Sequence, residues 1–142
     1  MFFEELKIGM QIQTESVVID KEEMLAFSRR YDNIPIHTDE TYAKSTNFGQ
    51  VIACGMMSFL TVWAKYLEQD FFGEELLAGK SQKVEWFKPV FAGDTLTGIA
   101  EITNLTDRNL RNGIAELTIH VYNQNDELVL VGVTEGIIKK RR

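Results

Sequence analysis

The amino-acid sequence predicts an α+β fold in which a curved, antiparallel sheet wraps around one long buried helix. A proline-free, strongly apolar segment of helical length runs from residue 55 to about residue 69. Most of the chain after it alternates between apolar and polar residues, as half-buried strands do. Turn residues separate these strands, and strands that follow one another as hairpins favour antiparallel pairing. With 142 residues, the chain is expected to form a single domain, residues 1–142.

The N-terminal part is expected to contain one strand and two short helices. Residues 8–20 mix isoleucine and valine with polar residues, a pattern typical of a strand. Asp20 is a suitable N-cap, and the apolar residues after it recur at helical spacing, which predicts an amphipathic helix over residues 21–30. Thr38 could cap another short helix over residues 39–44.

The segment over residues 55–69 is apolar on nearly every side, and a helix of this kind must be buried all round. In a small domain, the later strands have to cover it. These strands are expected over residues 82–87, 95–103, 114–122 and 128–138. A curved sheet around one helix is the hot-dog arrangement.

The composition excludes several classes of protein. The net charge of −6 argues against a nucleic-acid partner, and the basic residues 139–142 are expected to form a solvated tail. The single cysteine, Cys54, excludes an internal disulfide framework and fits a reducing cytoplasm, where we expect the protein to be located. No Cys/His cluster has zinc spacing, and we expect neither a metal site, a signal peptide nor a membrane span.

The most informative segment is residues 31–37, which contains an aspartate and a histidine around a proline. Pro35 fixes its own φ angle and disfavours helical geometry at Ile34. A loop bent in this way can direct the side chains of Asp32 and His37 at one point. An imidazole titrates near neutral pH and a carboxylate can orient or share its proton, so the two form a minimal acid–base pair. The alternative is an exposed loop in which both residues occur by chance.

The sequence resembles the MaoC-like dehydratases, whose best-described members are the (R)-specific enoyl-CoA hydratases. The family pattern Asp-x-Asn-Pro-x-His, followed by Phe-Gly and then Ile-Ala-His-Gly-Met, resembles residues 32–37, 48–49 and 52–56. Residues 84–94, with Pro89-Val90 and Gly93-Asp94, resemble a later run of the same family. These segments occur in the family order and span most of the chain.

The resemblance implies a function and the residues that carry it. Asp32 and His37 would be the catalytic pair of a hydratase or dehydratase that interconverts 2-enoyl and 3-hydroxyacyl thioesters. The backbone N–H of Gly55, at the start of the apolar helix, would bind the thioester oxygen. The partners would be an acyl-CoA or acyl-carrier thioester and a second copy of the chain, with the sites near the dimer interface. No cofactor is implied, because CoA enters as part of the substrate.

The chain departs from the family pattern at two positions. Ile34 replaces the motif asparagine, while Asn33 stands one residue earlier, and Cys54 replaces a histidine. A thiol at a helix N-terminus can be a nucleophile, but a small buried apolar role is more usual. Ser58 and Thr61 are candidates for a helix hydroxyl that some family members use.

Other residues suggest how a substrate would bind. The bulky Phe59 and Trp63 on the apolar helix would favour short acyl groups. Lysines near the expected mouth of the site could bind the phosphates of CoA, although a solvated strand face explains them equally well. These lysines are Lys80, Lys83 and Lys88. His120 is expected on the solvent face of its strand.

Two alternatives to a hydratase remain open. A hot-dog thioesterase would use the same fold to hydrolyse the thioester with a carboxylate and a water molecule. Such enzymes usually keep the carboxylate on the buried helix, and residues 55–66 contain no Asp or Glu. A non-catalytic acyl-thioester-binding subunit is the second alternative, and the presence of both Asp32 and His37 argues against it.

Overall fold

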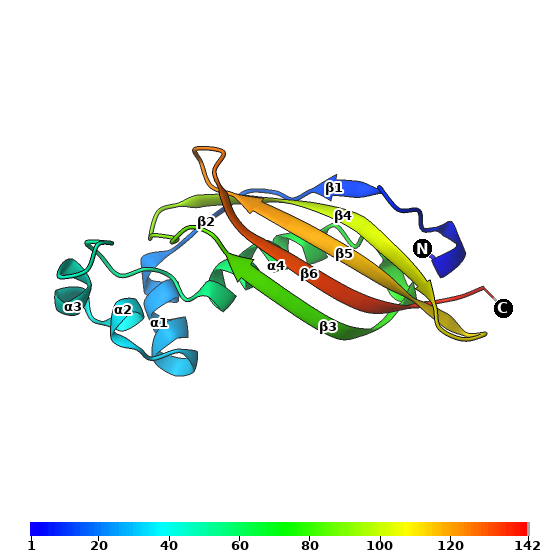
Figure 1. The fold of residues 1–142 in the computed structure, drawn as a ribbon, viewed down its shortest axis with the longest axis horizontal. Helices are drawn as coiled ribbons and strands as arrows, with labels where there is room; N and C mark the ends of the chain where they lie inside the picture. The colour runs from blue at the N-terminus through cyan, green and yellow to red at the C-terminus, as the bar shows by residue number, and fades with distance from the viewer. Residues whose placement is uncertain (142) are drawn as a thin grey trace.

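The computed structural model describes residues 1–141 and contains one antiparallel sheet of six strands (Figure 1). The strand order is β1-β4-β5-β6-β3, and the two-residue strand β2 also pairs with β4. The strands are β1 (Gln11–Gln13), β2 (Val17–Val18), β3 (Leu76–Trp86), β4 (Thr95–Asp107), β5 (Asn112–Tyr122) and β6 (Leu128–Lys139). The edge strand β3 therefore follows the helices in the chain but pairs with the last strand, β6.

Four α-helices and two 3-10 turns precede or separate these strands. The α-helices are α1 (Lys21–Tyr31), α2 (Pro35–Thr38), α3 (Glu40–Lys44) and α4 (Gly55–Glu68), and the turns are η1 (Phe3–Glu5) and η2 (Gly73–Glu75). Helix α4 lies along one face of the sheet, whereas α1, α2 and α3 gather beyond one end of it (Figure 1). The α+β, hot-dog arrangement predicted from the sequence is confirmed.

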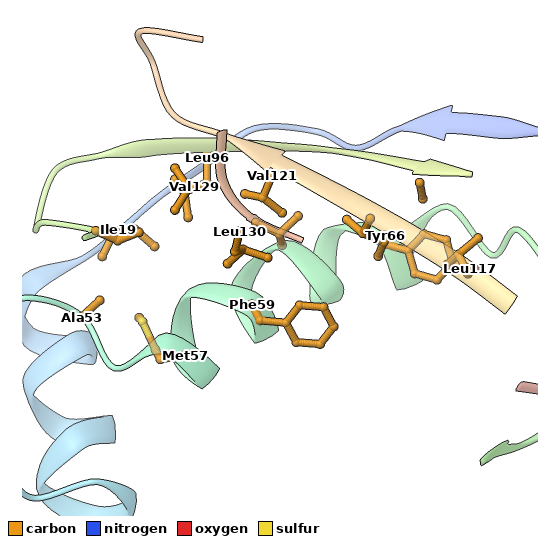
Figure 2. Close-up of a cluster of buried hydrophobic side chains, with 14 of the residues drawn as sticks. Ile19, Ala53, Met57, Phe59, Tyr66, Leu96, Leu117, Val121, Val129 and Leu130 are labelled. Atoms are coloured by element: carbon orange, nitrogen blue, oxygen red, sulfur yellow. The ribbon is translucent and has the colours of Figure 1, made fainter. Parts of the chain in front are cut away.

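The core lies between α4 and the sheet. Phe59 and Tyr66 project from α4 toward apolar side chains of the strands, among them Leu117 and Leu130 (Figure 2). The ring of Phe59 lies so close to Gly132 that a Cβ atom there would be 2.5 Å from it. Close packing of this kind fixes the position of α4 along the sheet, and with it the position of the helix N-terminus.

The strands with strict alternation were predicted well. Ala115, Leu117, Ile119 and Val121 of β5 are buried on the face expected for them, and β4 and β6 begin at the residues predicted. The predicted strand over residues 82–87 is too short, because β3 begins at Leu76. Nearly every residue of this edge strand is exposed, so no burial pattern marked its first half.

Three further predictions need correction. The expected strand over residues 8–20 consists of two short strands, β1 and β2, separated by residues 14–16. The cap of α3 is Asp39, whose side chain accepts a hydrogen bond from the Tyr42 N–H. Helix α4 is not buried all round, because the sheet covers only one side of it and Met56, Leu60 and Leu67 are exposed.

Candidate active site

Asp32 and His37 are positioned by two helix ends. Helix α1 begins at the predicted cap Asp20, which accepts from the Glu23 N–H, and it ends at Tyr31. Asp32 is the C-cap, and its N–H donates to the Ser28 carbonyl. Pro35 occupies the first turn of α2, where a missing N–H costs nothing, so the expected bent loop contains a short helix. His37 lies on that helix and therefore has a fixed orientation.

The two side chains meet as predicted. Nε2 of His37 lies 3.4 Å from Oδ2 of Asp32, and Nδ1 lies 2.9 Å from the carbonyl oxygen of Ile52. A carbonyl only accepts hydrogen bonds, so Nδ1 must carry a proton and donate it. Nε2 is then the nitrogen available for proton transfer. With the proton on Nδ1, Nε2 presents a lone pair to the Asp32 carboxylate oxygen, and two lone pairs repel each other. The Asp32–His37 pair must therefore share a proton or bind a donor such as water.

Burial distinguishes the roles of the two residues. The His37 side chain is 10% exposed, whereas the Asp32 side chain is 42% exposed. Asp32 lines an open cavity of about 520 Å³, and His37 supports it from behind. The other lining residues are Phe48, Ile52, Cys54, Gly55, Met56, Trp86, Phe87, Lys88 and Pro89. The cavity is therefore largely apolar, with one carboxylate in its wall.

The N-terminus of α4 opens into the same cavity at Gly55. N–H groups in the first turn of a helix have no partner within it and carry the positive end of the helix dipole. A Cβ atom at Gly55 would lie 2.4 Å from the Trp86 indole, so no larger residue fits without movement of the ring. The indole Nε1–H also donates to the Gly55 carbonyl over 2.9 Å. Trp86 thus holds the backbone that presents the Gly55 N–H.

Cys54 lies at the N-cap of α4 and is buried. Burial raises the pKa of its thiol, and the neighbouring Asp32 carboxylate raises that pKa further, although N–H groups of the helix start act in the opposite direction. The thiol is therefore favoured in its neutral form. This argues against Cys54 as an activated nucleophile and for the small apolar role.

The hydroxyls of Ser58 and Thr61 form hydrogen bonds to backbone carbonyls at or near the start of α4. Ser58 donates to the Cys54 carbonyl, and Thr61 donates to the Ser58 carbonyl. Neither residue lines the cavity. The positioning role considered for them therefore has no geometric support in this structure.

Of the three lysines considered for phosphate binding, only Lys88 lines the cavity. Its Nζ lies 3.0 Å from a Glu127 carboxylate oxygen. Lys80 and Lys83 lie farther along β3, where they pair with Glu135 and Glu85. His120 is half-buried on the sheet face away from α4 and takes no part in the cavity.

The structure offers no metal centre and no membrane helix within the part of the chain that it describes. Residues 1–141 contain no group of three His, Cys, Asp or Glu side chains that could hold a metal ion. Among the same residues, no helix has the length and apolar character needed to cross a membrane.

Sequence reasoning missed two groups that shape the site. The Ile52 carbonyl fixes the His37 ring, but a backbone atom leaves no signal in the sequence. Trp86 was recognised only as a strand residue, although it packs on Gly55 and lines the cavity. A signal was available, because Trp86 lies inside the segment over residues 84–94 that resembles the family.

Comparison with known proteins supports the family resemblance. Residues 4–123 match the model of the MaoC-like domain. The chain is 29% identical to the (R)-specific enoyl-CoA hydratase of Aeromonas caviae over 118 residues, which are 82% of this chain and 83% of that protein. It is 27% identical to the uncharacterized protein YdeM of Bacillus subtilis over 141 residues, covering 99% of this chain and 100% of that one.

Solved structures agree in fold. A structure described as a monoamine oxidase regulatory protein, from Archaeoglobus, superposes with a TM-score of 0.95 at 28% identity, covering 100% of this chain and 96% of that one. The structure of the A. caviae (R)-hydratase gives a TM-score of 0.74 at 28% identity, covering 96% of this chain and 98% of that one. The chain therefore belongs to the MaoC-like dehydratase domain family and has its hot-dog fold.

Proposed function

We propose that this protein is a hydratase/dehydratase that adds water to 2-enoyl thioesters, most simply CoA thioesters, and catalyses the reverse reaction. One observation carries the proposal. The Asp32 carboxylate, backed by Nε2 of His37, and Gly55 at the N-terminus of α4 line one cavity. These are an acid–base pair and an oxyanion donor, which are the groups that the reaction needs.

The proposed mechanism begins with a water molecule in the cavity, bound to the Asp32 carboxylate, which Nε2 of His37 contacts from behind. Asp32 orients the water and accepts its proton while the oxygen forms a bond to Cβ of the substrate. Electrons move to the thioester oxygen, which becomes an enolate, and the Gly55 N–H together with the dipole of α4 stabilises this charge. A proton shared by the Asp32–His37 pair then moves to Cα, and the enolate returns to a thioester. Atoms and charge balance without a redox step, so we propose that CoA is needed only as part of the substrate.

The relatives support this reaction class. The A. caviae relative is named as an (R)-specific enoyl-CoA hydratase and aligns over 82% of this chain. Its structure shares the hot-dog fold. The absence of Asp and Glu from Gly55 to Tyr66 of α4 distinguishes this site from a thioesterase site with its carboxylate on the helix.

We also propose a homodimer formed through β3. This edge strand has 11 residues, pairs only on its β6 side within residues 1–141, and is exposed along most of its length. Unpaired edge strands are templates for pairing with another chain, and the exposed Leu76, Leu77 and Trp86 add apolar area to this edge. Sedimentation velocity should show a dimer. Replacing Gln82, in the exposed middle of β3, by proline should shift the protein toward monomer, because the Gln82 N–H points away from β6 toward the open edge.

Hydration of crotonyl-CoA tests the proposed reaction. Loss of enoyl-thioester absorbance without release of free CoA, as followed with a thiol reagent, would support the hydratase. Asp32→Asn and His37→Ala variants should lose this activity. Release of CoA would indicate a thioesterase instead. A folded protein that transforms neither crotonyl-CoA nor longer enoyl-CoA substrates would contradict the proposal and favour a binding subunit.

A further inference from the structure

A second cavity lies under the C-terminal half of α4, apart from the one that contains Asp32. Its volume is about 360 Å³, and it is enclosed by α4, β3, β5 and β6. Apolar or small groups form most of its wall, including Trp63, Leu67, Phe72, Leu117 and Gly136. No step of the proposed mechanism uses this cavity.

One polar group in this cavity lacks a partner. Tyr66 is only 3% exposed, yet its hydroxyl makes no hydrogen bond within residues 1–141. Its ring lies beside Trp63, with 4.8 Å between the ring centroids, and points toward Leu117 (Figure 2). The buried Thr134 hydroxyl in the same wall differs, because it donates to the Leu117 carbonyl. Among the described residues, the fully buried atom without a partner is Oγ of Ser28, so the Tyr66 hydroxyl instead reaches the open space of the cavity, where it can donate to an acceptor.

The Tyr66 hydroxyl is suited to act as a donor. Burial raises the pKa of its phenol above the ordinary value, so the group stays neutral across the physiological pH range. A neutral phenol next to an apolar wall favours a neutral acceptor, because transfer of a charged group into such a cavity is costly. Alcohol, ketone and ether oxygens meet this requirement.

The two cavities are lined by the same two elements, α4 and β3, at successive positions along them. Met56 and Trp86 line the catalytic cavity, while Trp63 and Gln82 line the second one. Met56 and Trp63 are seven residues apart along α4, roughly 10 Å, and Trp86 and Gln82 are four residues apart along β3, roughly 13 Å. Leu60, between them on α4, is 39% exposed and lines neither cavity. An acyl chain whose thioester lies at Gly55 would therefore run toward Tyr66.

The positions of Phe59 and Trp63 also change the expectation for chain length. Phe59, which was expected to restrict the acyl group, is buried against Gly132 of β6 and lines neither cavity. Trp63 lines the distal cavity and not the catalytic one. The bulk of these two residues therefore does not limit the acyl group to a short chain.

We propose that Tyr66 is a specificity residue that donates a hydrogen bond to a neutral oxygen near the far end of the acyl chain. The preferred substrate class is then a medium-chain 2-enoyl thioester with a distal hydroxyl, keto or ether oxygen. This inference rests on the proposed hydratase function for the reaction, and on the second cavity for the selectivity.

The kinetic test compares 2-decenoyl-CoA with 10-hydroxy-2-decenoyl-CoA, and the corresponding dodecenoyl pair. The native protein should show a kcat/KM about tenfold or more higher for the hydroxylated member of at least one pair, the effect of about one hydrogen bond. Tyr66→Phe removes only the oxygen and should abolish this preference. Tyr122→Phe, the same change on the sheet face away from α4, should retain it. Equal rates for both pairs in the native protein, or a preference that survives in Tyr66→Phe, would overturn the proposal.

A binding test separates this inference from the proposed reaction. Trp63 lines the second cavity, so in a Trp86→Phe variant its fluorescence reports binding there. 10-Hydroxydecanoic acid should bind about tenfold more tightly than decanoic acid, and the added substitution Tyr66→Phe should remove the difference. If the native protein hydrates no enoyl-CoA, this result would sink the proposed function but keep the polar-tail site. If the native protein hydrates crotonyl-CoA, equal binding of the two acids would overturn the polar-tail site but keep the proposed function.

Discussion

The packed layer between α4 and the sheet differs from the helical segment that contains Asp32 and His37. In the packed layer, apolar side chains such as Phe59 and Leu117 are almost fully buried and have no reactive groups. In the helical segment, a half-exposed carboxylate and a buried imidazole meet at an open cavity. The comparison teaches that separate residues provide stability and chemistry. Helix α4 belongs to both regions, because its buried side stabilises the fold and its N-terminus enters the site.

Removal of the Asp32 charge should separate the two regions most clearly. Asp32→Asn keeps the shape of the side chain but removes the proton acceptor, so kcat/KM for crotonyl-CoA should fall about 10²–10⁴-fold. The melting temperature should barely change, because the carboxylate is 42% exposed and its pairing with His37 is long. Enzyme assays and thermal unfolding of the same samples measure both effects.

A matched control is available in the turn between β5 and β6. Asp126→Asn makes the same chemical change at an exposed position with a φ of 58°, which asparagine tolerates. It should leave both activity and stability unchanged. A large fall in the melting temperature of Asp32→Asn would mean that Asp32 is a structural residue.

The accuracy of prediction from the sequence depends on how far apart in the chain the interacting residues are. The alternation along β5 is a local pattern with a direct physical cause, burial of one face, so its inward residues could be assigned. Asp32 and His37 are five residues apart, so their approach could also be predicted from one bent segment. The first half of β3 has no such pattern, because an edge strand is exposed on both faces.

Contacts between distant segments could not be predicted from the sequence. Trp86 closes over Gly55 from 31 residues away, and the Ile52 carbonyl orients His37 from 15 residues away. Both contacts depend on how α4 and the sheet pack. Asp39 was overlooked as the cap of α3 for another reason, since Thr38 and Asp39 are both suitable caps and only the backbone geometry selects one.

The packed layer should show the opposite response to mutation. Phe59→Ala removes a buried ring that fills the space over Gly132, and the free energy of unfolding should fall by about 3–5 kcal/mol. The folded fraction should keep most of its activity per molecule at low temperature, because Phe59 does not line the catalytic cavity. Urea unfolding and assays at low temperature measure the two quantities.

Leu110→Ala is the control for Phe59→Ala, because Leu110 is 94% exposed. Its effect on unfolding should be within about 0.5 kcal/mol. A loss of activity in Phe59→Ala far beyond the loss of folded protein would show that the packed layer contributes to catalysis directly, and the separation of the two regions would be wrong.

Gly55→Ala probes the point where the two regions meet. The added methyl group would lie 2.4 Å from the Trp86 indole, so the ring or the helix start must move, at a cost of about 1–3 kcal/mol in stability. The shift should also lower kcat/KM, because the Gly55 N–H leaves its place in the cavity. Combining Gly55→Ala with Trp86→Phe should recover part of the stability, because the smaller ring gives space to the methyl group. Strictly additive effects in this double-mutant cycle would contradict the contact as the cause.

Cys54 should give the smallest effect, seen through pH. Its thiol is buried beside Asp32, and its pKa in the folded protein is raised above the unfolded value of about 8.5. The folded state therefore binds more protons than the unfolded state in this range, and stability must decrease as pH rises through about 8.5 toward the folded pKa. Cys54→Ala lacks this contribution, so the native-minus-variant difference in unfolding free energy should decline from pH 7 to pH 10. Other ionisations cancel in that difference. A thiol reagent should react slowly with the native protein at pH 7, and rapid reaction there would instead indicate an ionised thiol and restore the nucleophile hypothesis.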